Sequence, residues 1–105
     1  GIFGLSKDNL GLSTVKFGEL TLKIIHTPGH SEGGICLHTD GHLFAGDTLF
    51  SGSIGRTDLP GGDYDTLISS IKGKLLGFDE ATVVYTGHGP ETTIGNEKRM
   101  NPFLR

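Results

Sequence analysis

The sequence predicts an α+β fold with the element order β-β-β-β-α-β-α, within a single domain of 105 residues. The first observation is that four short apolar or alternating segments occupy the N-terminal part of the chain, and turn residues separate them. The second is that apolar residues recur at helical spacing in the segment after Asp63. One further apolar run and one further capped segment then complete the order.

The first two strands are expected at residues 14–17 and 20–25, where the chain alternates or runs apolar. Gly18 and Glu19 separate them and predict a hairpin turn. Residues 1–9 show no clear periodicity, so they are interpreted as an irregular segment that leads into the first strand.

A second predicted hairpin joins residues 34–38 to residues 43–45 through Asp40 and Gly41. Residues 51–63, "SGSIGRTDLPGGD", then carry four glycines and a proline and predict a long loop. Loops of this length inside compact domains are usually functional or disordered.

Asp63 is a good N-cap for the first helix, which is expected to end near Gly77. Its apolar positions are Leu67, Ile68, Ile71, Leu75 and Leu76. A short strand is expected at residues 82–85. Thr92 or Thr93 then caps a last helix that reaches about Met100.

Composition excludes several classes of function. The net charge is −3 and no run of Lys or Arg occurs, so a nucleic-acid partner is not expected. No apolar run approaches the roughly 18 residues of a membrane span, so no membrane partner is expected. The single cysteine, Cys36, forms no intrachain disulfide, which favours a cytoplasmic location.

Three polar residues share one local pattern. His30, Asp47 and His88 each stand at or shortly after the end of an apolar strand, and each directly follows a glycine. Loops at strand ends are places where a rigid sheet aims side chains at a common point. Two imidazoles and one carboxylate form a plausible ligand set for Zn, Fe or Mn.

Each of these residues also has a simpler interpretation. A histidine in a turn is more often solvated or capping than a metal ligand, and Asp47 fits a turn in which it bonds its own backbone. Weaker candidates have structural roles that suffice: packing or surface for His26 and His38, and exposure for His42. Other candidates with sufficient structural roles are Cys36 as a buried thiol, Arg56 and Asp58 as a pair, and Glu97, Lys98 and Arg99 as a solvated helix face.

Three longer stretches carry a family resemblance. "HTPGHSEGG", "LFAGDTLFSGSIGRTDLPGGD" and "VYTGHGPETTIGNEKRMNPFLR" resemble the later motifs of the metallo-β-lactamase superfamily, and most closely its glyoxalase II-like hydrolases. The resemblance covers residues 20–105. It implies that His30 is a ligand of a first metal, that Asp47 bridges two metals and that His88 is a ligand of the second. The metals implied are zinc ions, with Fe or Mn as alternatives.

The family's His-x-His-x-Asp-His motif is absent from the sequence. The resemblance therefore implies that residues 1–105 are the C-terminal half of a metallo-β-lactamase-like domain, that is, half of an αββα sandwich. Such a half leaves one sheet face open, which calls for a second half-domain or a homo-oligomer. Without it the chain is expected to be incomplete and inactive.

For the completed site, the resemblance implies cleavage of a small-molecule thioester or ester by a metal-bound hydroxide, with no side chain assigned to catalysis or to substrate binding. Two alternatives stay open. An iron-dependent persulfide dioxygenase also resembles this chain, including its "GRTD" element. The third hypothesis is a non-catalytic fragment or assembly half.

Overall fold

The computed structural model describes residues 3–7, 13–17 and 20–104. The strands are β1 (Phe3–Lys7), β2 (Ser13–Phe17), β3 (Leu20–His26), β4 (Ile35–Thr39), β5 (His42–Gly46), β6 (Leu49–Phe50), β7 (Ser53–Ile54), β8 (Val83–Thr86) and β9 (Thr92–Thr93). The helical segments are α1 (Tyr64–Ser70), η1 (Ile71–Leu75) and α2 (Ile94–Met100). These elements confirm an α+β fold. None of the helices in the described part of the chain is both long and apolar enough to cross a membrane.

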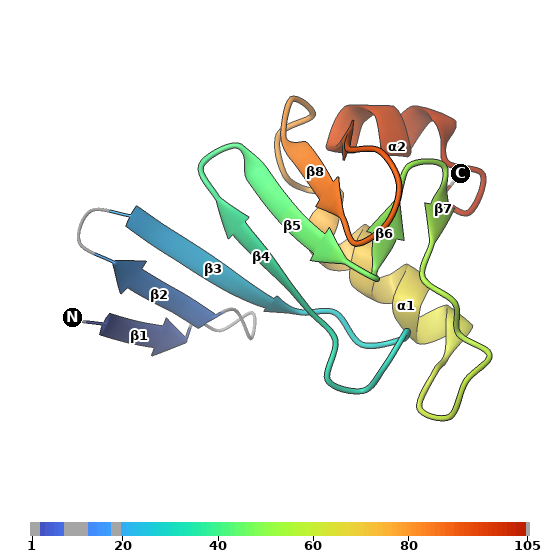
Figure 1. The fold of residues 1–105 in the computed structure, drawn as a ribbon, viewed down its shortest axis with the longest axis horizontal. Helices are drawn as coiled ribbons and strands as arrows, with labels where there is room; N and C mark the ends of the chain where they lie inside the picture. The colour runs from blue at the N-terminus through green and yellow to red at the C-terminus, as the bar shows by residue number, and fades with distance from the viewer. Residues whose placement is uncertain (1–2, 8–12, 18–19, 105) are drawn as a thin grey trace.

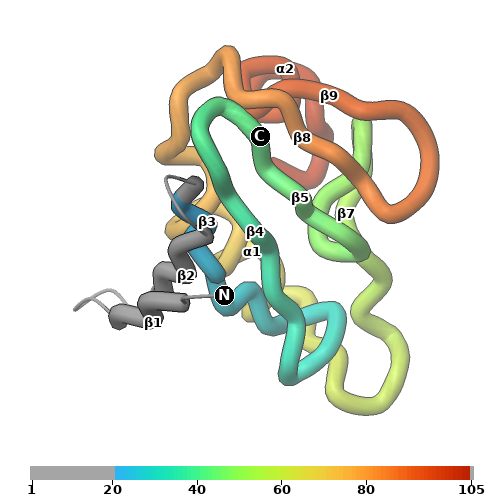
Figure 2. Tube along the Cα trace, turned by 60° about the vertical axis from the view of Figure 1, so that its left-hand side comes forward, coloured from blue at the N-terminus to red at the C-terminus, as the bar shows by residue number. Residues whose placement is uncertain are grey.

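The larger sheet has the strand order β1-β2-β3-β4-β5-β8-β9, and β6 and β7 form a separate two-stranded sheet. All neighbouring pairs are antiparallel except β5 and β8, which run parallel. In Figure 1 the large sheet fans from β1 at the left to β8 near the top, and α1 and α2 lie at the right. Figure 2 shows β4, β5 and β8 as neighbours across the middle of the molecule.

The four predicted strands at the N-terminal side of the chain are confirmed, with ends that differ by at most one residue. The irregular lead-in predicted for residues 1–9 is wrong at Phe3–Lys7, because these residues form β1 and pair with β2. A strand of this kind is stabilised by hydrogen bonds to its partner, so its own sequence needs no regular period. The predicted turn at Gly18 and Glu19 lies outside the described residues.

The long loop predicted for residues 51–63 is also partly wrong. Its beginning belongs to the β6–β7 hairpin, in which Phe50 pairs with Ser53 across a two-residue turn. Gly52 has a φ of +76°, a conformation that glycine adopts without a side-chain clash. The remaining stretch up to Asp63 is irregular, as predicted.

The predicted helix after Asp63 is confirmed at its start and changes geometry along its length. The Asp63 side chain accepts a hydrogen bond of 2.9 Å from the Thr66 amide, as an N-cap does. After Ser70 the chain continues as a π-helical turn, and the Leu76 amide donates to the carbonyl of Ile71. The second predicted helix is capped by Thr93, whose hydroxyl accepts from the Asn96 amide.

The core lies between one face of the large sheet and the helices. Its buried apolar members are Ile25, Cys36, Leu43, Ala45, Leu49, Leu67, Ile71, Leu75, Val84, Ile94 and Leu104. Burial of a Leu or Ile side chain contributes roughly 1.5–3 kcal/mol, so the helical stripe after Asp63 is a main source of stability. The sheet is thereby held rigid from one side.

The opposite face of the large sheet is open. The pairing register places Ile24, Leu37, Phe44 and Tyr85 in one row across β3, β4, β5 and β8. Phe44 keeps 45 % of its surface exposed, and Tyr85 stacks on it with ring centroids 5.0 Å apart. Among the described residues no helix covers this apolar row, whereas Ile25, Cys36 and Ala45, which alternate to the opposite face, are fully buried.

Candidate metal centre

Strand direction brings three loops to one edge of the sheet. Because β3 is antiparallel to β4, and β4 is antiparallel to β5, strands β3, β5 and β8 all run the same way. Their C-terminal ends therefore meet at one edge. Asp47 directly follows β5, His88 lies in the loop after β8, and His30 lies in the loop after β3. The sheet topology thus explains why residues far apart in sequence lie together.

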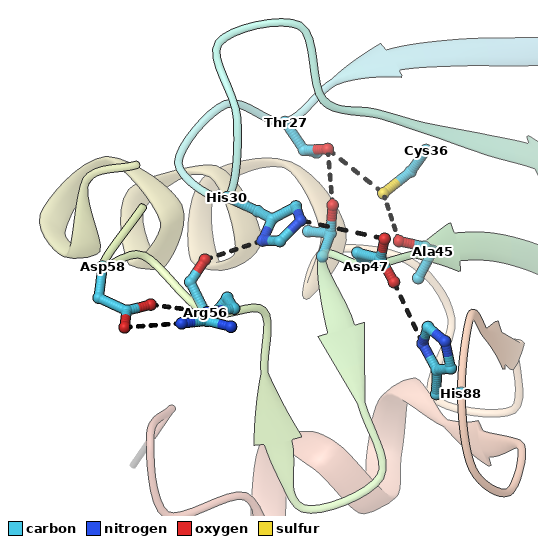
Figure 3. Close-up of polar contacts among 9 residues, drawn as sticks. Thr27, His30, Cys36, Ala45, Asp47, Arg56, Asp58 and His88 are labelled. Carbon is cyan, nitrogen blue, oxygen red and sulfur yellow. Dashed lines mark hydrogen bonds and ion pairs between the residues drawn. The ribbon is translucent and has the colours of Figure 1, made fainter. Parts of the chain in front are cut away.

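The side chains of His30 and His88 converge on the Asp47 carboxylate (Figure 3). His30 Nε2 lies 3.9 Å from Asp47 Oδ2, and His88 Nδ1 lies 3.4 Å from Asp47 Oδ1. Each carboxylate oxygen therefore faces a different imidazole. The exposed fraction of the side chain rises from 28 % for His30 through 50 % for Asp47 to 84 % for His88. The Asp47 carboxylate is the shared centre of two histidine–carboxylate pairs.

A backbone contact selects the tautomer of the neutral His30 ring. His30 Nδ1 donates a hydrogen bond of 2.8 Å to the carbonyl oxygen of Arg56, which has no proton to give. In the neutral imidazole the proton is therefore on Nδ1, and the lone pair is on Nε2, the atom that faces Asp47. Metal-ligating histidines commonly have this second hydrogen bond, which orients the ring.

Three glycines allow the loops to approach this closely. A Cβ on Gly87 would lie 2.8 Å from Asp47 Oδ1, and a Cβ on Gly55 would overlap the Asp47 carbonyl oxygen. Gly29 has a φ of +135°, and a Cβ there would overlap the backbone of Leu67 in α1. The glycines beside His30 and His88 are therefore needed because a side chain there would clash, and not only because glycine permits tight turns.

A buried polar layer supports the Asp47 loop from the core side (Figure 3). The hydroxyls of Thr27 and Thr48 lie 3.2 Å apart, and Thr27 Oγ1 lies 3.4 Å from Cys36 Sγ. The Cys36 thiol donates to the Ala45 carbonyl oxygen at 3.8 Å. Burial raises the pKa of this thiol despite the hydrogen bonds from the two threonines, so it is a buried, unreactive group.

An open cleft of about 400 Å³ contains the three polar side chains. Its lining residues are His30, Asp47, Phe50, Ser53, Ile54, Gly55, Arg56 and His88. The β6–β7 hairpin supplies one wall, and the Phe50 ring lies 6.3 Å from the His88 ring. The cleft is therefore formed by the three strand-end loops together with a hairpin that the sequence did not predict.

The donor types suit a metal ion, but the ligand set of the described residues is incomplete. Neutral imidazole nitrogens and a carboxylate bind Zn, Fe and Mn. No three His, Cys, Asp or Glu side chains within the described part of the chain are close enough to hold a metal by themselves. Each imidazole faces the carboxylate separately, so further ligands are required at both positions.

The weaker histidine candidates have the structural surroundings that the sequence indicated. His26 Nε2 donates to the Glu32 carbonyl oxygen at 2.7 Å. His38 stacks on Phe78 with ring centroids 4.0 Å apart, and burial is the main cause that lowers its pKa. His42 is exposed, and its Nδ1 lies 2.9 Å from the Tyr85 hydroxyl. None of these three histidines lines the cleft.

Arg56 and Asp58 pair with each other, as the sequence suggested. Two hydrogen bonds of 2.8 and 2.9 Å join the guanidinium to the carboxylate, and both side chains are largely exposed. The guanidinium holds the pKa of the Asp58 carboxyl below its usual value. Arg56 also lines the cleft, and its carbonyl oxygen orients His30.

Glu97 overturns the prediction of a solvated helix face. Its side chain is fully buried and accepts hydrogen bonds from Gly52 N, Thr92 Oγ1, Asn96 Nδ2 and Asn101 Nδ2, at distances of 2.6 to 2.9 Å. The neighbouring Lys98 and Arg99 do stay exposed and pair with Glu80. No signal in "TTIGNEKRMN" marks this burial, because a polar segment of this kind is usual for a surface helix.

The surroundings of Glu97 predict a pH dependence of stability. Burial by itself would raise the pKa of this carboxyl, but the hydrogen bonds outweigh it and hold the pKa below the usual 4.5. A carboxyl with a lowered folded-state pKa stabilises the fold above its unfolded-chain pKa, and this contribution disappears as the pH falls through the folded-state value. Unfolding free energies measured in urea from about pH 7 to about pH 3 should therefore fall more steeply for the wild type than for Glu97→Gln. Parallel curves would contradict this.

Comparison with known proteins supports the same family. A model of the metallo-beta-lactamase superfamily matches residues 4–88. The hydroxyacylglutathione hydrolase GloC of Haemophilus influenzae is 51 % identical over 92 residues, which are 86 % of this chain and 43 % of that protein. The chain therefore spans less than half the length of this curated relative.

Solved structures give the same result. The BLEG-1 B3 metallo-beta-lactamase aligns with a TM-score of 0.83 and 49 % identity, over 87 % of this chain and 44 % of that one. ETHE1 from Myxococcus xanthus aligns with a TM-score of 0.80 and 34 % identity, over 85 % and 41 %. TTHA1623, solved in a di-iron-bound form, aligns with a TM-score of 0.76 and 47 % identity, over 79 % and 42 %. The family model matches most of this chain, and the chain belongs to the metallo-β-lactamase superfamily.

Proposed function

We propose that this chain supplies His30, Asp47 and His88 to a two-metal site that hydrolyses a small-molecule thioester or ester. The observation that carries the proposal is the arrangement at Asp47, whose two oxygens each face a different imidazole. A carboxylate placed in this way can hold one metal ion on each oxygen. The similarity to the hydroxyacylglutathione hydrolase GloC supports a thioester as the substrate class.

The roles of the individual side chains follow from their contacts. His30 would bind through Nε2, because Nδ1 carries the proton that is donated to Arg56. His88 would bind on the other side of Asp47, and its exposure leaves room for further ligands. Metal ions held there by His30, Asp47 and His88 would lower the pKa of water and supply hydroxide near neutral pH. Zinc is the metal proposed; iron or manganese suits the same donors, and the di-iron form of TTHA1623 supports iron.

A second half-domain completes the site in this proposal. The sequence contains no His-x-His-x-Asp-His motif, and among the residues that the structure describes His30 and His88 each have only Asp47 as a partner ligand. The open apolar row that contains Phe44 also calls for a covering surface. We therefore propose that residues 1–105 form the C-terminal half of the domain. The other half would supply the missing ligands and cover this face.

Native mass spectrometry of the purified protein tests this proposal. We expect about one to two metal ions per chain in assemblies that contain a second half, and no retained metal in a monomer of this chain, because two protein ligands are fewer than the three or four of known sites. Addition of the second half should produce thioester hydrolysis. Tight metal binding and rapid thioester turnover by the isolated monomer would contradict the need for completion.

One further activity has specific support. Similarity to ETHE1 from M. xanthus and the paired Arg56 and Asp58 of the "GRTD" element favour an iron-dependent persulfide dioxygenase as the second candidate. Two histidines and one carboxylate suit Fe(II) oxygen chemistry. Oxygen consumption with glutathione persulfide would select this activity, whereas thioester cleavage without oxygen uptake selects the hydrolase.

A further inference from the structure

Glu97 connects two segments that flank the cleft. Its Oε1 accepts from the Gly52 amide at the tip of the β6–β7 hairpin, at 2.9 Å. Its Oε2 accepts from the Thr92 hydroxyl in β9, at 2.6 Å. The hairpin continues into Gly55 and Arg56, whose carbonyl orients His30, and β9 follows the loop that carries His88. The buried Glu97 carboxylate is therefore bonded both to the hairpin that leads to Arg56 and to the strand that follows the His88 loop.

The contacts of Glu97 require an ionised carboxylate. Both oxygens accept two hydrogen bonds each, because Asn101 Nδ2 also donates to Oε1 and Asn96 Nδ2 donates to Oε2. Three of the four groups that point at these oxygens are N–H donors, on Gly52, Asn96 and Asn101. An amide in place of the carboxylate would direct its own NH2 group at such a donor. Asn101 extends the connection, since its Nδ2 also donates to the Ser53 carbonyl oxygen in the hairpin, at 3.0 Å.

We propose that Glu97 is a positioning residue for the metal centre: it fixes the β6–β7 hairpin against the segment after the His88 loop and so sets the placement of His30 and His88 around Asp47. It touches none of these three side chains and acts through the hairpin and β9. A shift of the hairpin would reach His30 through the Arg56 carbonyl, and a shift of β9 would reach His88 through the loop that precedes it. This role rests on the metal site proposed above.

Two pairs of variants test the role of Glu97. Glu97→Gln removes the charge and keeps the shape, and Glu80→Gln is its control, because Glu80 pairs on the surface with Arg99. Thr92→Val removes the hydroxyl that donates to Glu97, whereas Thr92→Ser keeps it. Ile71→Val, a buried change in η1, provides a loss of stability without a change at the cleft.

The first readout is the imidazole ¹⁵N spectrum of the metal-free protein. We expect the His30 and His88 ring signals to shift in Glu97→Gln and Thr92→Val, and to keep their wild-type positions in Glu80→Gln, Thr92→Ser and Ile71→Val. Lower stability with unchanged ring signals in Glu97→Gln and Thr92→Val would overturn the positioning role and leave Glu97 as a purely structural residue. Thr92→Val keeps the test decisive if Glu97→Gln does not fold.

The second readout is Co²⁺ affinity in the protein completed by its second half. We expect Glu97→Gln and Thr92→Val to weaken Co²⁺ binding by about 10-fold to 100-fold and to change the visible spectrum of the bound ion, as loss of a supporting contact does. Unchanged affinity in both variants would overturn the proposal. If the completed wild type binds no Co²⁺, the metal site itself is refuted, and the ring signals alone decide the role of Glu97.

Discussion

Asp47→Asn is expected to lower metal affinity in the completed protein on the order of 100-fold or more, beyond the cost of losing a supporting contact. The amide keeps the shape of the side chain but has one oxygen and no charge. It therefore cannot offer an oxygen on both sides, toward His30 and toward His88, where the carboxylate oxygens lie 3.9 and 3.4 Å from the two rings. Competition with a chromophoric chelator measures the affinity, and the metal content per chain should fall with it.

Two histidine variants of the same chain extend this test, and the second is its control. His30→Ala should weaken metal binding strongly, because it removes Nε2, the nitrogen whose lone pair faces Asp47. His42→Ala should change affinity by about twofold or less, as surface substitutions do, since His42 contacts Tyr85 on the open sheet face. Similar losses at His30, Asp47 and His42 would show that the metal binds elsewhere.

Gly55→Ala is the second change with a large expected effect. An added Cβ would overlap the Asp47 carbonyl oxygen and lie 3.3 Å from the Cβ of His30. The loops must separate to accept the methyl group, so we expect a loss of about 1–3 kcal/mol or more in unfolding free energy. Metal affinity should fall at the same time, because the two displaced residues are the proposed ligands. Chemical denaturation and chelator competition measure the two effects.

Gly73→Ala provides the control for this substitution. Gly73 lies in η1 with no atom within 4 Å of an added Cβ and without a positive φ. Replacement of such a glycine should stabilise the fold by about 0.4–1 kcal/mol, through the lower entropy of the unfolded chain. A Gly55→Ala protein as stable as the wild type, with full metal affinity, would show that the two loops are not held in close contact.

Much of the architecture could be predicted from the sequence. The Asp63 cap, the apolar stripe of α1 and η1, and the Asp40-Gly41 turn are local signals, because each depends on residues a few positions apart. The glycines beside His30, Asp47 and His88 marked the three strand ends. The later motifs were specific enough to identify the superfamily, which the family model confirms. These features needed no knowledge of tertiary contacts.

Tertiary structure decided what depends on contacts between distant segments. β1 was missed because its order comes from pairing with β2, and β6–β7 was missed because its short strands lie within a glycine-rich segment. Glu97 looked solvated because its helix is short and polar, whereas its donors come from Gly52 and Thr92. The nitrogen of His30 that is left free to bind a metal, Nε2, is decided by the Arg56 carbonyl, which lies 26 positions away in the sequence. By itself the sequence determined the residue types and their places at strand ends; only the fold decided which atoms face each other, because long-range packing sets those distances.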